Sequence, residues 1–258
     1  MSTKTVWITG ASSGIGREFA RRYARLGFRL ILTARRRDRL ETLAAELRAK
    51  HGTLCRIVPA DLEQDAQVTA LCEALADERI DLFINNAGFG ACGAFSETDA
   101  GKELSMLRVN VLAMHRLFKF TLRKMEAQGF GTILNVASSA GLLPGGPYMA
   151  GYYASKAYVV SLTRGVAEEL REQHSPVYVC ALCPGPVDTE FNDRAGVVFA
   201  LKGITPEFCV QEAMHGMMHR RIIIVPSAFM RACTTAQKLL PASLLMPIVA
   251  RQQKKKLG

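Results

Sequence analysis

The sequence predicts an α/β protein built on one doubly wound parallel sheet with helices on both faces. Short apolar runs rich in branched residues alternate with stretches in which apolar residues recur at helical spacing. Glycine-rich, asparagine-rich and serine-rich runs follow directly after several of the apolar runs. Such an alternation is typical of a parallel sheet, whose functional sites lie beyond the carboxyl ends of the strands. The 258 residues are enough for one domain of this kind.

Composition excludes some classes of protein and leaves others open. With 49% hydrophobic and 22% charged residues, the chain is not of the disordered type. The net charge of +10 allows an anionic partner such as nucleic acid, a membrane surface or a phosphorylated small molecule, and charge alone does not choose among them. No apolar run resembles a signal peptide or reaches the length of a membrane-spanning helix, so we expect a cytoplasmic protein.

The seven cysteines are odd in number and scattered, which indicates reduced thiols rather than a disulfide framework. Cys180 and Cys183 form a C-x-x-C at the end of a strand-like run and stop at Pro184-Gly185. A redox motif of this spacing opens a helix instead. We therefore interpret the two thiols as buried strand residues rather than a redox or zinc site.

The first expected strand covers residues 5–9 and leads directly into a glycine-rich turn, residues 10–16. Apolar residues then recur at helical spacing up to Gly27. Backbone without side chains can approach a pyrophosphate closely, and the helix N-terminus offers free N–H groups. The spacing G-x-x-x-G-x-G departs from the usual dinucleotide fingerprint, so an ordinary glycine-rich turn is the alternative.

The second expected strand, residues 28–33, is followed by a run of arginines instead of the acid that holds the ribose of NAD. Planar, permanently charged guanidinium groups suit a 2′-phosphate, which favours NADP over NAD. Arg35, nearest the strand end, is the preferred ligand. Arg36 and Arg37 could instead be a solvated helix start, and Asp38 with Glu41 reads as a capping box.

Further strands are expected at residues 54–59, 80–84, 132–136, 177–182 and 222–225. The first three of these are followed by Asp61-Leu62, by an Asn-Asn-Ala-Gly turn at residues 85–88 and by Ser138-Ser139. Asn110 stands between two valines in a helical stretch. Its local sequence favours a polar side chain tied to nearby backbone.

Tyr152 and Lys156 stand four residues apart on an expected helix, and so share one face. A free phenol titrates near pH ~10 and transfers protons poorly at neutrality. An ammonium group beside it would favour the phenolate and lower the pKa toward working pH. The alternative is a chance pair that lines a half-exposed face.

These motifs together resemble the classical short-chain dehydrogenases/reductases. The chain carries Thr9-Gly10-x-x-x-Gly14-x-Gly16, Asn85-Asn86-Ala87-Gly88, Asn110, Ser138, Tyr152-x-x-x-Lys156 and Pro184-Gly185 in the family's order. The resemblance covers residues 4–189 and includes the glycine spacing, which is the family's own variant. It implies a Rossmann-type fold and hydride transfer between a nicotinamide cofactor and a carbonyl or alcohol.

The resemblance also implies roles for single residues. Tyr152 would donate the proton in reduction, Lys156 would hold the nicotinamide ribose and lower the tyrosine pKa, Ser138 would bind the carbonyl oxygen, and Asn110 would anchor a water. Ser138 lies one residue farther from Tyr152 than is common, and it is preferred over Ser139 because the loop at residues 144–147 can hold the extra residue. The cofactor would be bound by Gly10, Ser12, Ser13, Gly14, Ile15, Gly16, Arg35, Arg36, Asp61, Leu62, Asn86, Ala87, Gly88, Tyr152, Lys156, Pro184, Gly185, Val187 and Thr189.

The end of the chain is less specific. We expect residues 1–227 to form the domain, with a lid over the substrate at about 189–220, and residues 228–258 to form an amphipathic, basic tail. His215 and His219 stand one helical turn apart, but no third ligand is evident, so a surface helix is favoured over a metal site. Pro241 and Pro247 are expected to break the tail into short segments. Its apolar residues and lysines suit either shallow docking on an anionic membrane or packing on the domain or a partner subunit.

The sequence thus predicts an NADP(H)-dependent oxidoreductase without a metal, acting on a lipophilic ketone or aldehyde such as a 3-oxoacyl, steroid-like or xenobiotic carbonyl. Similar proteins are commonly dimers or tetramers, so a homo-oligomer is expected. Nucleic acid is not expected as a partner, because the basic residues concentrate at the cofactor turn and the tail without interleaved aromatics. A catalytically idle NADP-binding regulator or scaffold is the rival, against which the complete Asn–Ser–Tyr–Lys set argues.

Overall fold

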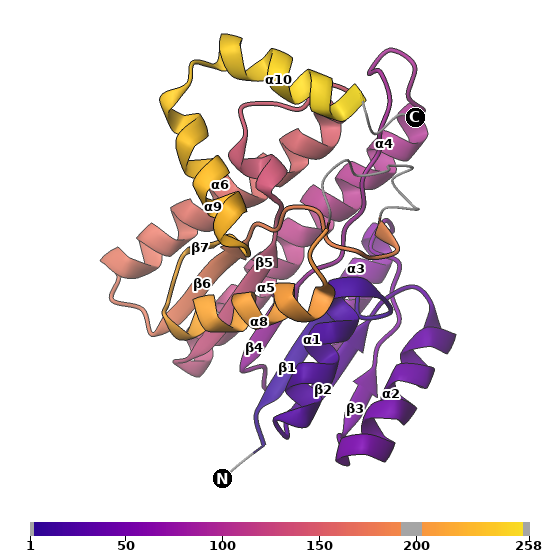
Figure 1. Cartoon of the computed structure of the whole chain (residues 1–258). Helices are drawn as coiled ribbons and strands as arrows, with labels where there is room; N and C mark the ends of the chain where they lie inside the picture. The colour runs from indigo at the N-terminus through magenta and orange to yellow at the C-terminus, as the bar shows by residue number, and fades with distance from the viewer. Residues whose placement is uncertain (1–2, 192–202, 255–258) are drawn as a thin grey trace.

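The computed structural model describes residues 3–191 and 203–254, and its strands form one parallel sheet with helices on both faces (Figure 1). Within these residues the strand order is β3-β2-β1-β4-β5-β6-β7. The fold class predicted from the sequence is therefore confirmed. The strands are β1 Thr5–Thr9, β2 Arg29–Thr33, β3 Cys55–Ile57, β4 Leu82–Asn85, β5 Gly131–Val136, β6 Val177–Leu182 and β7 Ile223–Ile224.

The helices divide between the two faces of the sheet. One face is covered by α1 Gly14–Arg25, α2 Arg37–His51 and α8 Pro206–Met218. The other is covered by α3 Asp65–Ala74, α5 Met114–Gln128 and α6 Ala150–Glu172. The remaining elements are α4 Ala100–Leu107, the π-helix η1 Arg108–Ala113, the 3-10 helices η2 Ser139–Leu142 and η3 Gln237–Leu239, α9 Ala228–Ala236 and α10 Ala242–Lys254.

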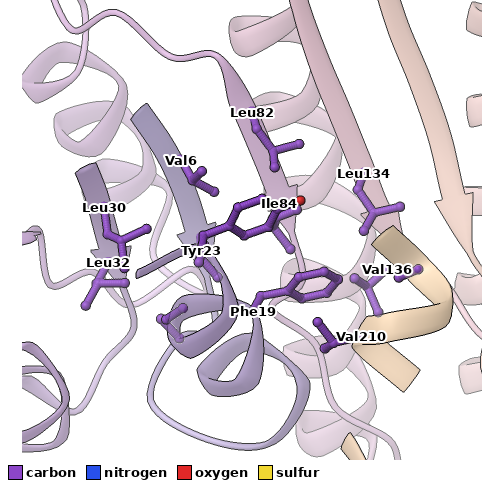
Figure 2. Packing of buried hydrophobic residues seen from close by; sticks show 14 of the residues in the cluster. Val6, Phe19, Tyr23, Leu30, Leu32, Leu82, Ile84, Leu134, Val136 and Val210 are labelled. Atoms are coloured by element: carbon purple, nitrogen blue, oxygen red, sulfur yellow. The ribbon is translucent and has the colours of Figure 1, made fainter. Parts of the chain in front are cut away.

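The two cores follow from the alternation of side chains along each strand. Val6 packs toward α1, where Phe19 and Tyr23 meet the sheet (Figure 2), while its neighbour Trp7 faces the opposite side. There Trp7 stacks on Phe83 with ring centroids 4.2 Å apart. Burying a side chain of this size contributes about 1.5–3 kcal/mol, so both faces of each central strand stabilise the fold.

The order of the strands reverses at β1, which pairs in parallel with β2 on one side and with β4 on the other. From β1 the chain builds the sheet toward one edge through β2 and β3, and then toward the other edge from β4 onward. That arrangement opens a crevice at the carboxyl ends of the strands, the usual ligand site of a doubly wound sheet. In Figure 1, α9 and α10 lie beyond this end of the sheet.

Several local predictions are corrected or confirmed. The capping box at Asp38 is wrong, because α2 begins at Arg37 with Arg36 as its N-cap and no side chain capping it. Asp38 instead lies in the first turn, where its charge favours the positive end of the helix dipole. Pro247 does not break the tail, since it lies inside α10.

The C-x-x-C thiols are buried and free, as expected, with Cys180 in β6 and Cys183 directly after it. His215 lies in the last turn of α8, and His219, its C-cap, has Nδ1 2.8 Å from the His215 carbonyl. No group of three or more potential metal ligands occurs within the described residues.

The expected lid at 189–220 falls in part on residues 192–202, which lie outside the described residues. The later part of that range includes α8, which packs against α1. The division of the chain at residue 227 stays a prediction. In the part of the chain that the structure describes, no helix is long and apolar enough to cross a membrane.

Candidate active site

A cavity of about 300 Å³ lies at the carboxyl ends of the strands, between the glycine turn, the start of α6 and the last turn of α10. Most of the residues singled out from the sequence line it, although they come from the start of α6 and from six loops, one after each of the strands β1 to β6. Gly16 and Asn110 do not line the cavity and instead lie behind its wall. The fold therefore brings the separate motifs together in one place.

The glycine turn forms the floor of one half of the cavity. Gly10 and Gly14 have positive φ angles of 65° and 52°, a conformation that favours glycine. A Cβ on Gly16 would lie 2.4 Å from the Gly10 carbonyl oxygen, so no side chain fits there. Helix α1 begins at Gly14, and no side chain caps its N-terminus. This backbone can approach a phosphate closely. The glycine turn at residues 10–16, called the glycine cradle below, therefore fits the pyrophosphate of a dinucleotide.

The arginines beside the turn are all engaged with acidic or hydroxyl partners. Arg36 donates to the hydroxyls of Ser12 and Ser13, at 3.2 and 3.3 Å, and to the Glu190 carboxylate at 3.2 Å. Arg35 is half-exposed and donates to Glu63 at 3.0 Å. Both arginines line the cavity, and Arg36 is the one that lies on the glycine turn.

Glu190 is a member of the cavity wall that the sequence reasoning missed. Arg39 donates to both of its carboxylate oxygens, at 2.7 and 2.8 Å. Burial favours the neutral acid, but Arg39 and Arg36 outweigh that effect and lower the Glu190 pKa below its usual value. The carboxylate therefore stays charged at neutral pH and neutralises part of the arginine cluster.

The turn after β4 also lines the cavity. Asn86 Nδ2 donates to the Thr9 carbonyl at 2.9 Å, and the Asn86 amide N–H donates to the Thr9 hydroxyl at 2.9 Å. These bonds tie the end of β4 to the end of β1. A Cβ on Gly88 would lie 2.8 Å from Asn110 Oδ1 and 3.2 Å from Lys156 Nζ, so the two polar groups converge at this glycine.

Tyr152, Lys156 and Ser138 form the other half of the cavity. Tyr152 and Lys156 lie in the first turns of α6 and are 8% and 5% exposed. Lys156 Nζ lies 5.9 Å from the centre of the Tyr152 ring and donates to the Val136 carbonyl at 3.0 Å. Ser138 follows β5, hydrogen-bonds the Tyr152 hydroxyl, and accepts from the Ala140 amide at 3.1 Å. Ser139 lines the same cavity, and the preference for Ser138 over Ser139 stays a prediction.

The protonation of this group differs from the sequence expectation. Burial raises the pKa of Tyr152 to about 12, and the hydrogen bond with Ser138 offsets only part of that rise. Burial also lowers the pKa of Lys156 to about 8. The expected lowering of the tyrosine pKa is therefore wrong for this structure, because desolvation of the phenol dominates. Tyr152 therefore holds its proton at neutral pH in this structure.

Asn110 lies in η1, a π-helical segment between α4 and α5, and is 1% exposed. Its Nδ2 donates to the Phe89 carbonyl at 2.9 Å and to the Ser155 hydroxyl at 3.1 Å, and its Oδ1 accepts from the Phe89 amide at 3.1 Å. The side chain is thus tied to nearby backbone, and the water-anchoring role that the resemblance implies for it stays a prediction. Short π-helical segments of this kind are frequent at functional sites.

The tail supplies residues that no motif indicated. Leu245 and Val249 of α10 are buried against Tyr152 and Tyr153, and Gln253 lines the cavity. Phe191 covers Tyr152, with ring centroids 5.6 Å apart. Gln253 and Tyr153 are separated by 100 residues in the chain. Their contact arises from the path of the chain, so no local signal could have predicted it.

Comparisons with known proteins agree with this geometry. The family model for short chain dehydrogenases matches residues 4–196. Galactitol 2-dehydrogenase (L-tagatose-forming) of Cereibacter sphaeroides is 38% identical over 186 residues, which cover 72% of this chain and 72% of that protein.

Two solved structures are similar over nearly the whole chain. A short-chain dehydrogenase from Sphingobium yanoikuyae in complex with NADPH is 34% identical, with a TM-score of 0.84, and the match covers 94% of this chain and 95% of that one. A short chain dehydrogenase/reductase from Burkholderia phymatum in complex with NAD is 29% identical, with a TM-score of 0.84, and covers 95% and 96%. The similar structures thus include complexes with either nucleotide.

Proposed function

The chain belongs to the short-chain dehydrogenase/reductase family of oxidoreductases that use a nicotinamide cofactor, and on that premise we propose that it is an NADP(H)-dependent reductase of lipophilic ketones or aldehydes. The observation that carries the proposal is the meeting of Ser138, Tyr152 and Lys156 in the same cavity as the glycine turn. In this proposal the glycine turn binds the phosphates of the cofactor, and Ser138, Tyr152 and Lys156 are the groups that bind the carbonyl and transfer the proton.

A nicotinamide cofactor held in this cavity would supply the hydride for the reduction of a carbonyl group. The residues of the chain position the carbonyl group and supply the proton that the new alcohol needs. Ser138 donates a hydrogen bond to the carbonyl oxygen, on which negative charge develops. Tyr152 then transfers its hydroxyl proton to that oxygen, and Lys156 stabilises the phenolate that remains. Because burial raises the tyrosine pKa, the hydroxyl is protonated at neutral pH, and its proton is available when the carbonyl oxygen becomes basic.

NADP(H) is proposed over NAD(H) because of the arginines at the end of β2. A 2′-phosphate placed beside Ser12 and Ser13 would meet the guanidinium group of Arg36, whose forked donors match a phosphate. Arg35 borders the same part of the cavity. The phosphate would have to replace or join the Glu190 carboxylate on Arg36, so we assign the principal contact to Arg36 and a supporting contact to Arg35.

A lipophilic substrate is proposed from the lining next to Tyr152. Apolar and aromatic side chains of the cavity wall pack in one cluster with the tyrosine there, namely Phe89, Leu143, Met149 and Phe191. Such a lining binds hydrocarbon and disfavours charged substrates, since a charge loses its hydration on entering it. Long-chain 3-oxoacyl, steroid-like and xenobiotic ketones have this character.

A panel of such ketones tests the function directly. With the purified full chain, we expect NADPH absorbance at 340 nm to fall with at least one lipophilic ketone, and to fall much less with NADH at equal concentration. Absence of turnover across the panel, together with tight NADPH binding by calorimetry, would favour the idle NADP-binding regulator instead. A clear preference for NADH would contradict the assignment of Arg36.

We also propose a cytoplasmic homo-oligomer, a dimer or tetramer, that contacts membranes through the outer face of α10. The inner face of this helix is buried against the cavity wall, so packing on the domain explains the apolar residues of that face. The outer face keeps Leu244 and Ile248 exposed, at 60% and 55%, and Arg251 and Lys254 follow in the last turn. An apolar stripe ending in cations suits an anionic bilayer surface.

Vesicle sedimentation tests the membrane contact. We expect vesicles that contain phosphatidylserine to bind the wild type severalfold better than pure phosphatidylcholine vesicles, and a Leu244→Ser/Ile248→Ser variant to lose that difference. Truncation near residue 227 is a poor test, because it would remove part of the cavity wall. If the variant dissociates the oligomer and leaves vesicle binding unchanged, the outer face is a subunit contact instead.

A further inference from the structure

Gln253, in the last turn of α10, is a polar side chain built into the apolar half of the cavity. It is 2% exposed and lines the cavity wall. Its Nε2 donates to the hydroxyl of Tyr153, which is 7% exposed and lines the same wall. Leu245 and Val249 hold α10 against this wall, so the glutamine is placed by the packing of the whole helix.

The amide oxygen of Gln253 has no hydrogen-bond partner among the described residues. A buried amide oxygen that has lost water and gained no donor is costly, and folded proteins rarely keep one without a reason. The residue lines a ligand cavity, although the oxygen itself is buried in the empty site. A donor that enters with the ligand would satisfy the oxygen once the amide group turns toward the cavity.

We propose that Gln253 and Tyr153 form a polar subsite that recognises a neutral hydroxyl group on the substrate, remote from the carbonyl that is reduced. The hydroxyl donates to Gln253 Oε1. This inference rests on the proposed carbonyl reductase function and narrows its substrate class to hydroxylated lipophilic ketones. Tyr152, Tyr153 and Gln253 line one cavity, and the two tyrosine rings are 6.4 Å apart between centroids, so the subsite lies beside the catalytic tyrosine.

The surroundings favour a neutral donor over a charged one. Apart from Lys156, the charged side chains of the cavity lie beside the glycine turn and the end of β2, where the nucleotide is proposed to bind. They are Arg35, Arg36, Asp61 and Glu190. Around Tyr153 the neighbours are apolar, and burial raises the Tyr153 pKa to about 12, so its hydroxyl stays neutral. An ammonium group would lose its hydration here without gaining a counter-ion, whereas a hydroxyl loses much less.

A second glutamine offers a matched control. Gln237 in η3 is also buried, its Nε2 donates to the Leu142 carbonyl at 2.6 Å, and its Oε1 likewise has no partner among the described residues. Unlike Gln253, it does not line the cavity. Gln237→Leu therefore makes the same chemical change in the same tail without touching the proposed subsite.

The experiment compares nonan-2-one, its monohydroxylated derivatives at carbons 4 to 8, and the corresponding methyl ethers, by kcat/KM with NADPH. We expect at least one hydroxylated ketone to exceed the parent by about tenfold, since one satisfied hydrogen bond to a buried acceptor has that effect. The matching ether, which cannot donate, should behave like the parent. The preference should fall to about twofold or less in Gln253→Leu/Tyr153→Phe and persist in Gln237→Leu.

Thermal unfolding separates recognition from a merely structural role. The double variant replaces both polar partners by apolar groups of similar shape, so we expect its Tm without ligand to stay close to that of the wild type. The best hydroxylated ketone should raise the Tm of the wild type and of Gln237→Leu, and leave that of the double variant unchanged. A lower Tm with an unchanged hydroxyl preference would show that Gln253 only anchors α10.

Other outcomes are equally decisive. If the wild type reduces parent, ethers and alcohols equally well, the subsite is wrong and the reductase function stands. If the ethers match the alcohols, the wall recognises an acceptor, and the assignment of Gln253 Oε1 is overturned. If no ketone of the series or of the wider panel is reduced, the subsite and the proposed function fail together.

Discussion

Tyr152→Phe is expected to lower kcat for ketone reduction by about 10²- to 10⁴-fold, the usual contribution of a positioned general acid. The substitution removes one hydroxyl and keeps the buried ring that packs against Tyr153 and Phe191. The fold and the nucleotide cradle should therefore be unaffected. NADPH fluorescence titration should give a Kd within about twofold of the wild type, because the loss lies in the proton transfer step alone.

Tyr158→Phe is the matched control, since it makes the same change on the same helix. Its hydroxyl lies 2.7 Å from His115 Nδ1, and the side chain does not line the cavity. We expect its kcat to equal that of the wild type. If Tyr152→Phe retained more than a tenth of wild-type turnover, the phenol would not be the proton donor and the proposed mechanism would be wrong.

Gly16→Ala is expected to weaken NADPH binding by about 100-fold or more and to lower the free energy of unfolding by about 1–3 kcal/mol, the usual cost of overpacking. The added Cβ would lie 2.4 Å from the Gly10 carbonyl oxygen and 2.6 Å from Asn86 Nδ2. Neither neighbour can withdraw easily, because Gly10 is backbone and Asn86 is tied to Thr9. The turn must open, which moves the amides that hold the phosphates.

Gly165→Ala, in the exposed middle of α6, is the control for this substitution. Nothing lies within 4 Å of its Cβ position, so alanine should stabilise the helix by about 0.5–1 kcal/mol and leave NADPH binding unchanged. Urea denaturation and fluorescence titration measure the two effects separately. Wild-type NADPH affinity in Gly16→Ala would contradict the placement of the pyrophosphate on the glycine turn.

Much of the fold was predictable because its signals are local. The strands at 5–9 and 177–182 were placed at their observed limits, since branched apolar runs there end abruptly at glycine or proline. The strand expected at 80–84 is found at Leu82–Asn85, because its limits depend on pairing with β1 and β5. The capping box failed for a related reason: α2 starts at Arg37, whose neighbour Arg36 reaches back to the glycine turn.

The sequence by itself determined the order of the elements, the glycine cradle and the Tyr152–Lys156 pair, since each depends on residues close together in the chain. Only the tertiary structure decided the protonation of that pair, because a pKa in a buried site follows the loss of water from all sides. It also decided that the last turn of α10 lines the cavity and brings Gln253 to Tyr153. Composition could describe the tail as apolar and basic, but which face of a helix is buried depends on what the rest of the chain places beside it.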